Sequence, residues 1–279
     1  MKTKRFFSTL FPTRRSQTRK LPTHARNLLR FESLEERTLL SISPFQYDAI
    51  QSKYSDFNLP ESMEDINIIE ITNQDLTAEK LQKEIYNAAY DTSGPDLIVL
   101  RTTSDRNTIT YATWSDKINI SIDSTKYGSL TIVSLGFDND GKSIPLTIDA
   151  AQQSHVMSIY TTATVNLGGL TLTGGTIDSS GGAIHNQGTL TVMNSTIEGN
   201  SASTGGGIYN LGTLTVINST IAGNSASFGG GIYNSNGGTM TVKNSTIAGN
   251  SAEFNGGGIY DSGNGILIVT KWVIAGNSA

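Results

Sequence analysis

GGGIYNLGTLTVINSTIAGNSA, residues 205–226, recurs three more times with few changes between residues 181 and 279. The other copies begin at Gly181, Gly229 and Gly256, and the isoleucine after the opening glycines recurs at intervals of 24, 24 and 27 residues. A self-similar period of this length is typical of stacked arrays in which each repeat is one structural unit. The repeats therefore decide the fold class before any other feature of the chain.

Each copy carries the pattern of short β-strands. In the run Leu214–Asn218, Leu214 and Val216 share one face, and the residues that alternate with them share the other. No apolar pattern at helical spacing runs through a copy, which disfavours solenoids of paired helices. The pattern predicts a right-handed parallel β-helix, with three short strands and tight corners in each rung and rungs about 4.8 Å apart.

Asparagine recurs at two positions of the copies, and both positions are predicted to form inward ladders. At a corner, an asparagine side chain can hydrogen-bond the amide of its neighbour in the next rung and so satisfy buried polar groups. The first position also belongs to Asn-Ser-Thr triplets, which are glycosylation acceptors when exposed, but the ladder is the preferred interpretation. The two predicted ladders are Asn194, Asn218 and Asn244, and Asn200, Asn224, Asn250 and Asn277.

An aromatic residue or histidine directly follows the inward isoleucine. Because neighbours along a strand point to opposite faces, these rings are predicted to form an outward stripe with one ring per rung. Exposed ring faces can stack on sugars, so the stripe is the candidate ligand-binding site. The alternative is that the rings pack on one another or lie under a loop. The predicted stripe consists of Tyr160, His185, Tyr209, Tyr233 and Tyr260.

The first part of the chain differs in charge from the rest. Residues 1–37 hold ten of the twenty Lys and Arg residues and carry a net charge of +7, whereas the remainder carries −11. Residues 1–41 are therefore interpreted as a basic targeting segment, largely disordered. The apolar run at residues 6–11 is too short for a secretory signal, and no segment reaches membrane-spanning length. Nucleic acid is not expected as a partner, because no folded region of the same charge would deliver this segment to it.

Between that segment and the repeats, three regions are distinguished. Residues 42–72 are interpreted as a linker with a possible first strand at its end. Residues 73–95 contain an amphipathic helix with Thr77 as its N-cap, which is placed to cover the open end of the coil. Residues 96–180 contain short alternating runs and are interpreted as degenerate rungs. With the regular repeats of residues 181–279, the coil is predicted to start near residue 96 and to have about seven rungs.

Phe31–Ser41 resembles the short N-terminal signature of planctomycete-type surface proteins, Leu-Glu-Pro-Arg-x-Leu-Leu, with Glu36 in the place of the proline. Members of that family are large proteins that are exported or associated with the envelope. The resemblance covers about a dozen residues and implies that this region is a targeting signal, with the mature protein outside the cell or in the cell envelope, associated with the outer membrane. The matching residues are Leu34, Glu35, Arg37, Leu39 and Leu40.

The repeats resemble those of polymorphic outer membrane proteins, which pair a Gly-Gly-Ala-Ile element with Phe-x-x-Asn. Here the second element is Ile-x-Gly-Asn, as in Ile221–Asn224. The lead-in at residues 76–100 also resembles the helix that opens the coil in bacterial β-helix surface proteins. The resemblance to the polymorphic outer membrane protein repeats covers about a third of the chain. It implies a β-helix and an adhesin or surface protein.

Catalysis is the alternative, because parallel β-helices also form the scaffold of pectate lyases and polygalacturonases. Those enzymes need clustered carboxylates, for Ca²⁺ or as an acid–base pair. After Val165 the acidic residues fall at different places of the repeat, so stacking is not expected to gather three of them, and none of the three histidines has a partner by motif. No catalytic residue, metal site or cofactor is predicted. The acidic residues are Asp178, Glu198, Glu253 and Asp261.

The sequence thus favours an exported β-helix scaffold that binds polysaccharide or other cell-surface ligands. The alternative is a carbohydrate-active lyase or hydrolase whose active part is missing or degenerate. The last copy ends inside the repeat at Ala279, so the chain is expected to be a truncated part of a longer array. An uncovered last rung also predicts end-to-end association.

Overall fold

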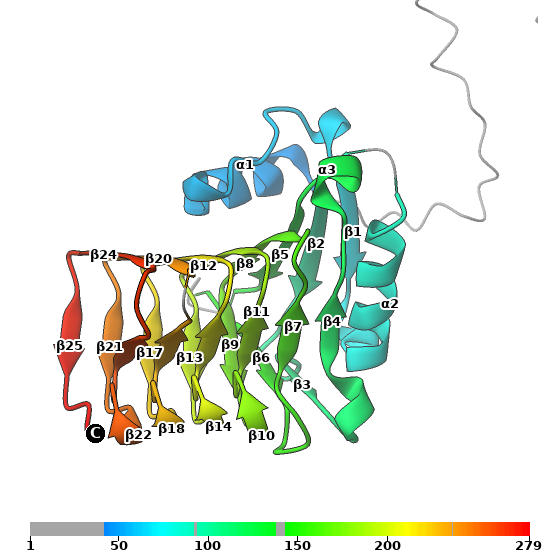
Figure 1. Ribbon diagram of the computed structural model, residues 1–279. Helices are drawn as coiled ribbons and strands as arrows, with labels where there is room; N and C mark the ends of the chain where they lie inside the picture. The colour runs from blue at the N-terminus through cyan, green and yellow to red at the C-terminus, as the bar shows by residue number, and fades with distance from the viewer. Residues whose placement is uncertain (1–41, 92–93, 138–142, 236) are drawn as a thin grey trace, which may run out of the picture. The chain divides into compact units, whose positions relative to one another are not determined.

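The computed structural model describes residues 42–91, 94–137, 143–235 and 237–279. The basic segment of residues 1–41, with its predicted signature, lies outside the described residues. Within the described part of the chain, parallel strands form a β-helix of about eight turns, counted on the eight strands of its longest sheet (Figure 1). The predicted fold class is confirmed.

Four parallel sheets form the walls of the coil in the described residues, and the chain visits them in the order sheet 1 to sheet 4. Sheet 1 consists of β1 (Asn67–Ile71), β2 (Asp96–Arg101), β5 (Leu130–Leu135), β8 (Thr164–Gly168), β12 (Thr189–Met193), β16 (Thr213–Ile217), β20 (Thr239–Lys243) and β24 (Ile266–Thr270). Sheet 2 consists of β3 (Thr108–Thr110), β6 (Leu146–Asp149), β9 (Leu170–Thr173), β13 (Thr196–Glu198), β17 (Thr220–Ala222), β21 (Thr246–Ala248) and β25 (Val273–Ala275).

The other two walls are shorter. Sheet 3 consists of β10 (Thr176–Ser180), β14 (Ser201–Thr204), β18 (Ser225–Phe228) and β22 (Ser251–Asn255). Sheet 4 consists of β4 (Ile118–Ile120), β7 (Met157–Ile159), β11 (Ile184–Asn186), β15 (Ile208–Asn210), β19 (Ile232–Asn234) and β23 (Ile259–Asp261).

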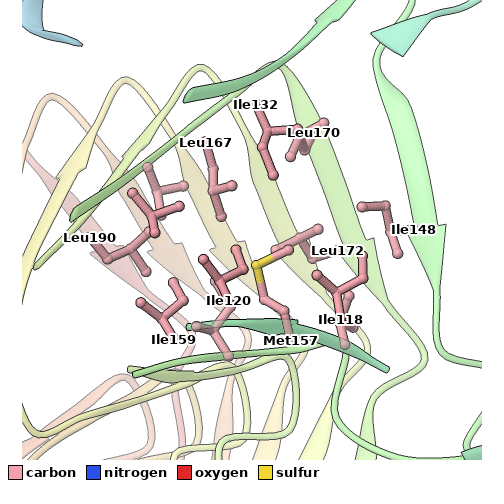
Figure 2. Close-up of a cluster of buried hydrophobic side chains, with 14 of the residues drawn as sticks. Ile118, Ile120, Ile132, Ile148, Met157, Ile159, Leu167, Leu170, Leu172 and Leu190 are labelled. Atoms are coloured by element: carbon pink, nitrogen blue, oxygen red, sulfur yellow. The ribbon is translucent and has the colours of Figure 1, made fainter. Parts of the chain in front are cut away.

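Equivalent residues of successive copies lie next to one another in the stack. Ile208 pairs with Ile184 on one side and with Ile232 on the other, and all three side chains are buried. Such inward columns fill the interior with apolar side chains, each worth about 1.5–3 kcal/mol when fully buried. Figure 2 shows part of this interior, with Ile118, Ile120, Ile132, Ile148, Met157, Ile159, Leu167, Leu170, Leu172 and Leu190.

Two details of the predicted coil are wrong. The coil begins at β1, not near residue 96, because β1 pairs directly with β2 although a helix separates them in sequence. Turns from β10 onward have four strands and not three, since small alternating residues such as those of Ser201–Thr204 form an additional strand in sheet 3. The sequence from residue 67 onward is therefore already part of the scaffold.

The helix α2 (Ala78–Ala88) closes the N-terminal end of the coil. Thr77 is its N-cap and accepts a hydrogen bond from the Lys80 amide at 3.1 Å. Leu81 and Ile85 are buried in the main core. The side chain of Gln82 pairs with both backbone groups of Asn119 on β4, the edge strand of sheet 4, at 2.7 and 3.1 Å. The helix thus covers the apolar end and also satisfies an otherwise open sheet edge.

A second helix, α1 (Pro44–Lys53), lies in the region that the sequence analysis interpreted as a linker. That interpretation is wrong. Ser43 and Gln46 form a capping box around Pro44 at the first helical position. Tyr47, Ile50 and other apolar residues that follow pack on the outer face of sheet 1. The fit is close at Gly168, where a Cβ atom would lie 2.6 Å from the Tyr54 ring.

The remaining helices are short. They are η2 (Ser55–Phe57), η3 (Met63–Asp65), η4 (Asn73–Asp75), η5 (Trp114–Asp116) and α3 (Ser124–Tyr127). Of these, α3 is capped by Asp123 and lies in the connection between sheets 4 and 1.

Candidate functional site

The outer face of sheet 4 carries a continuous column of rings. Parallel pairing of β11, β15, β19 and β23 places one ring from each strand in register. The preceding isoleucine points into the core, so each ring points outward and is half-buried. We call this set the aromatic column; it consists of His185, Tyr209, Tyr233 and Tyr260.

The rings of the aromatic column stack on one another. The ring centroids of His185 and Tyr209 lie 5.3 Å apart with an angle of 19° between the planes, and those of Tyr209 and Tyr233 lie 5.2 Å apart at 27°. Tyr260 follows at 5.2 Å from Tyr233, tilted by 45°. Mutual stacking covers most of the ring faces, so a ligand meets ring edges and phenol hydroxyls.

Tyr160 does not belong to the aromatic column, contrary to the prediction. In sheet 4, Met157 pairs with Ile184 and Ser158 with His185, so Tyr160 lies two residues beyond the matching position, outside the strand. A shift of two residues keeps the inward and outward faces unchanged, and both Met157 and Ile159 are buried. The alternation of inward and outward residues therefore does not distinguish the alignment of Ser158 with His185 from the alignment of Tyr160 with His185.

The predicted ladder of Asn200, Asn224, Asn250 and Asn277 lies at the corner between sheets 2 and 3. Each of the three contacts along it is an Nδ2–H to Oδ1 hydrogen bond of 2.9 Å. The first three side chains are buried, and each of them also donates to a backbone carbonyl. This column is structural, because its polar groups are used within the coil.

The predicted inward ladder of Asn194, Asn218 and Asn244 is a misassignment. These residues have φ values of 50°, 50° and 47°, the left-handed conformation that asparagine tolerates at a corner, and Asn218 and Asn244 are exposed. Asn244 donates to Asn218 at 2.6 Å, and Asn194 donates to the carbonyl of Lys53 near the end of α1. Asparagine occurs at these three positions because it tolerates the left-handed conformation of the corner, not because it makes a buried hydrogen bond.

Two buried ladders were missed. At the corner after sheet 1, the serine hydroxyls accept hydrogen bonds from backbone amides of the neighbouring turn at 3.1–3.2 Å, and the members are Ser195, Ser219 and Ser245. At the end of the sheet 4 strands, side-chain amides bond along the stack at 2.7, 2.8 and 3.2 Å, and the members are Asn186, Asn210, Asn234 and Asp261. Both ladders correspond to positions that repeat in the copies. The members of the second ladder lie two residues after the isoleucine that follows the opening glycines, as Asn210 does after Ile208.

A serine–histidine pair lies beside the aromatic column and was also missed. The Ser158 Oγ and His155 Nε2 atoms are 2.6 Å apart, and both side chains are buried. Burial, with smaller contributions from Lys117 and His185, lowers the pKa of His155 to about 4. The imidazole is therefore neutral near pH 7. Its Nδ1 atom is buried without a hydrogen-bond partner, so this pair lacks the group that orients a catalytic histidine.

The acidic residues of the repeats lie on different walls or several turns apart. Asp178 and Glu253 belong to sheet 3 but to its two outermost strands, whereas Glu198 belongs to sheet 2. Asp261 accepts a hydrogen bond from Asn234. Within the described part of the chain, no three His, Asp or Glu side chains gather where they could hold a metal ion.

Comparison with known proteins adds no identification: no family model matches the chain, and no curated protein or solved structure is significantly similar to it. Among the described residues, no helix has the length and apolarity that crossing a membrane requires.

Proposed function

We propose that this protein is an exported surface scaffold that binds polysaccharide along the outer face of sheet 4. The observation that carries the proposal is the aromatic column, in which outward rings recur once per turn. A repeating surface suits a repeating ligand. Several weak contacts along one sugar chain then add up through their high effective concentration.

The chemistry of the aromatic column supports a sugar ligand. Each tyrosine combines an apolar ring with a phenol hydroxyl, which can donate and accept a hydrogen bond; that of Tyr209 donates to Ser235 Oγ at 3.4 Å and can still accept one. The column is also continued sideways by apolar rings, because Phe228 lies 5.9 Å from Tyr260 and 5.1 Å from Phe254. Sugars present the same combination of hydroxyl groups and apolar C–H faces.

The alternative predicted from the sequence, a β-helix lyase or hydrolase, receives no support from the acidic residues of the repeats. The enzymes in question act through paired or metal-bound carboxylates. In the described residues, the four candidate carboxylates lie on different walls or several turns apart. A binding role needs none of these groups.

The test is a pull-down on immobilised polysaccharides with the full chain. A variant with Tyr209→Ala, Tyr233→Ala and Tyr260→Ala should bind at least about tenfold more weakly, as truncated aromatic anchors do. The matched control is Tyr160→Ala, which removes an exposed tyrosine outside the column. Equal retention of wild type and triple variant, with both folded by circular dichroism, would refute the proposal. Labelling of the protein on intact cells tests export separately.

A further inference from the structure

The cap at the N-terminal end of the coil carries a second group of aromatic rings, which lies outside the repeats of residues 181–279. Tyr86 lies on α2, Tyr90 lies just after it, and Tyr127 ends α3. Lys126 extends over the Tyr127 ring, with its Nζ atom 4.7 Å from the centroid. We call this group the cap cluster; it consists of Tyr86, Tyr90, Lys126 and Tyr127.

Tyr86 and Tyr90 lie outside the core, whereas Tyr127 is half-buried and packs against it. Leu81, Ile85 and Ala88 form the buried side of α2, whereas Tyr86 is 60% and Tyr90 63% exposed. Tyrosine is also a poorer helix former than alanine or lysine. Burial in the core therefore does not account for these two rings, and exposed apolar groups that gather in one place are found at binding sites.

The geometry of the cap cluster differs from that of the aromatic column. The centroids of Tyr86 and Tyr90 are 4.9 Å apart with the planes at 51°, and those of Tyr90 and Tyr127 are 6.4 Å apart at 56°. Rings tilted by this much meet edge to face, and Tyr86 and Tyr90 keep further ring surface exposed to solvent. Interaction with the Tyr86 phenol is the first cause that raises the pKa of Tyr90, which agrees with the contact between the two rings. The cap cluster thus presents the exposed ring surface of Tyr86 and Tyr90 beside Lys126.

The charges select an uncharged ligand. Interaction with the Tyr127 side chain is the first cause that raises the pKa of Lys126, and the charge of Asp123 adds a smaller contribution. Asp123 is itself held by the Thr125 amide and hydroxyl at 3.2 and 2.6 Å. Residues 38–279 carry a net charge of −11, which repels nucleic acids and acidic polysaccharides. A neutral ligand avoids this repulsion.

We propose that the cap cluster binds a sugar ring of an uncharged polysaccharide. An open tyrosine face packs on the C–H face of the sugar, and the phenol hydroxyls and the lysine ammonium bond its hydroxyl groups. The site is separate from the aromatic column, and the inference does not depend on sugar binding there.

The experiment measures binding of the full chain to neutral hexaoses of the cello-, laminari-, xylo- and malto-series by isothermal titration calorimetry. At least one hexaose should bind, and the double variant Tyr86→Ala with Tyr90→Ala should weaken it at least about tenfold. Because both side chains are exposed, the variant should keep the wild-type thermal transition. Tyr160→Ala is the matched control and should leave binding unchanged.

Three results would overturn the proposal. One is binding of none of the neutral hexaoses, and another is equal binding by wild type and the double variant. The third is loss of binding only in the triple variant of the aromatic column, which would place the sugar on sheet 4 and support the proposed function instead. Polygalacturonate and oligothymidylate serve as charged probes. Binding that is confined to either of them would exclude the neutral sugar as the ligand.

Discussion

Replacing Asn224 by alanine tests the physical basis of the coil. The side chain is 1% exposed and makes four hydrogen bonds. Its Oδ1 atom accepts from the backbone amide and the side chain of Asn200 at 3.0 and 2.9 Å. Its Nδ2 atom donates to the carbonyl of Ile197 at 3.0 Å and to Asn250 Oδ1 at 2.9 Å. Alanine removes all four and leaves the partners in a place that excludes water.

The expected cost follows from the groups that lose their partners. The Asn200 side chain keeps bonds to two other carbonyls, but its backbone amide loses the acceptor recorded for it. A buried donor without an acceptor costs about 1–3 kcal/mol, and the other three bonds together add about 1 kcal/mol, because Asn200 Nδ2 and Asn250 Oδ1 keep other partners. We expect Asn224→Ala to lower the free energy of unfolding by about 2–4 kcal/mol. This is a large part of the 5–15 kcal/mol that is typical of a folded domain.

The matched control is Asn218→Gly, six residues earlier in the same copy. Asn218 is exposed with a φ of 50°, and glycine already occupies the equivalent corner at Gly169, with a φ of 69°. The control should change stability by no more than about 0.5 kcal/mol. The assay is urea unfolding of the full chain followed by far-ultraviolet circular dichroism, with transition midpoints compared because repeat arrays do not always unfold in two states. Equal midpoints for the two variants would refute the ladder as a source of stability.

Three further substitutions test the cap and the buried titratable groups. Burial lowers the pKa of His155 to about 4, so as the pH falls the imidazole takes up a proton in the unfolded chain before it does so in the folded one, and the free energy of unfolding should fall by about 1–2 kcal/mol between pH 7 and pH 5. His155→Gln should flatten the urea midpoint as a function of pH over this range. An unchanged slope would contradict the assignment. Burial raises the pKa of Asp96 to about 6, so the charge of this carboxylate opposes folding at neutral pH. Asp96→Asn should therefore raise the urea midpoint at pH 7 but not at pH 4. A lower midpoint at both pH values would show that the carboxylate is needed. Gln82→Ala leaves the backbone amide of Asn119 at the sheet edge without its acceptor and should lower the stability measured by thermal unfolding by about 1–3 kcal/mol. Lys83→Ala, on the exposed side of the same helix, should change it little. Equal melting temperatures for these two variants would remove the edge-pairing role of Gln82.

The repeats made the coil predictable because inward positions are constrained from both neighbouring turns. Ile208 must fit against Ile184 and Ile232, so the same residue returns at the same place, and the register follows directly from the sequence. The cap helix was predictable for a related reason. Its Leu81 and Ile85 repeat at helical spacing because they cover the end of the same core.

The errors arise where one residue type serves two purposes. Asparagine satisfies buried backbone groups at Asn224 and adopts the left-handed conformation at Asn218, and a repeated letter does not distinguish the two. Tyr160 was misplaced because a two-residue shift leaves the alternation intact. The helix α1 was missed because it buries only Tyr47 and Ile50, so no apolar stripe reveals it, although the capping box at Ser43 was readable.

Repetition has a different meaning on the outside of the coil. Tyr209, Tyr233 and Tyr260 recur at outward positions, but copying of a whole repeat would preserve them even without selection for a ligand, and their stacking gives them a structural role. Tyr86 and Tyr90 cannot be explained in this way, since they lie outside the repeats and contribute nothing to the core. Neither duplication nor burial in the core accounts for these two exposed rings. The two proposed sites therefore rest on different observations, which are repetition for the aromatic column and exposure outside the repeats for the cap cluster.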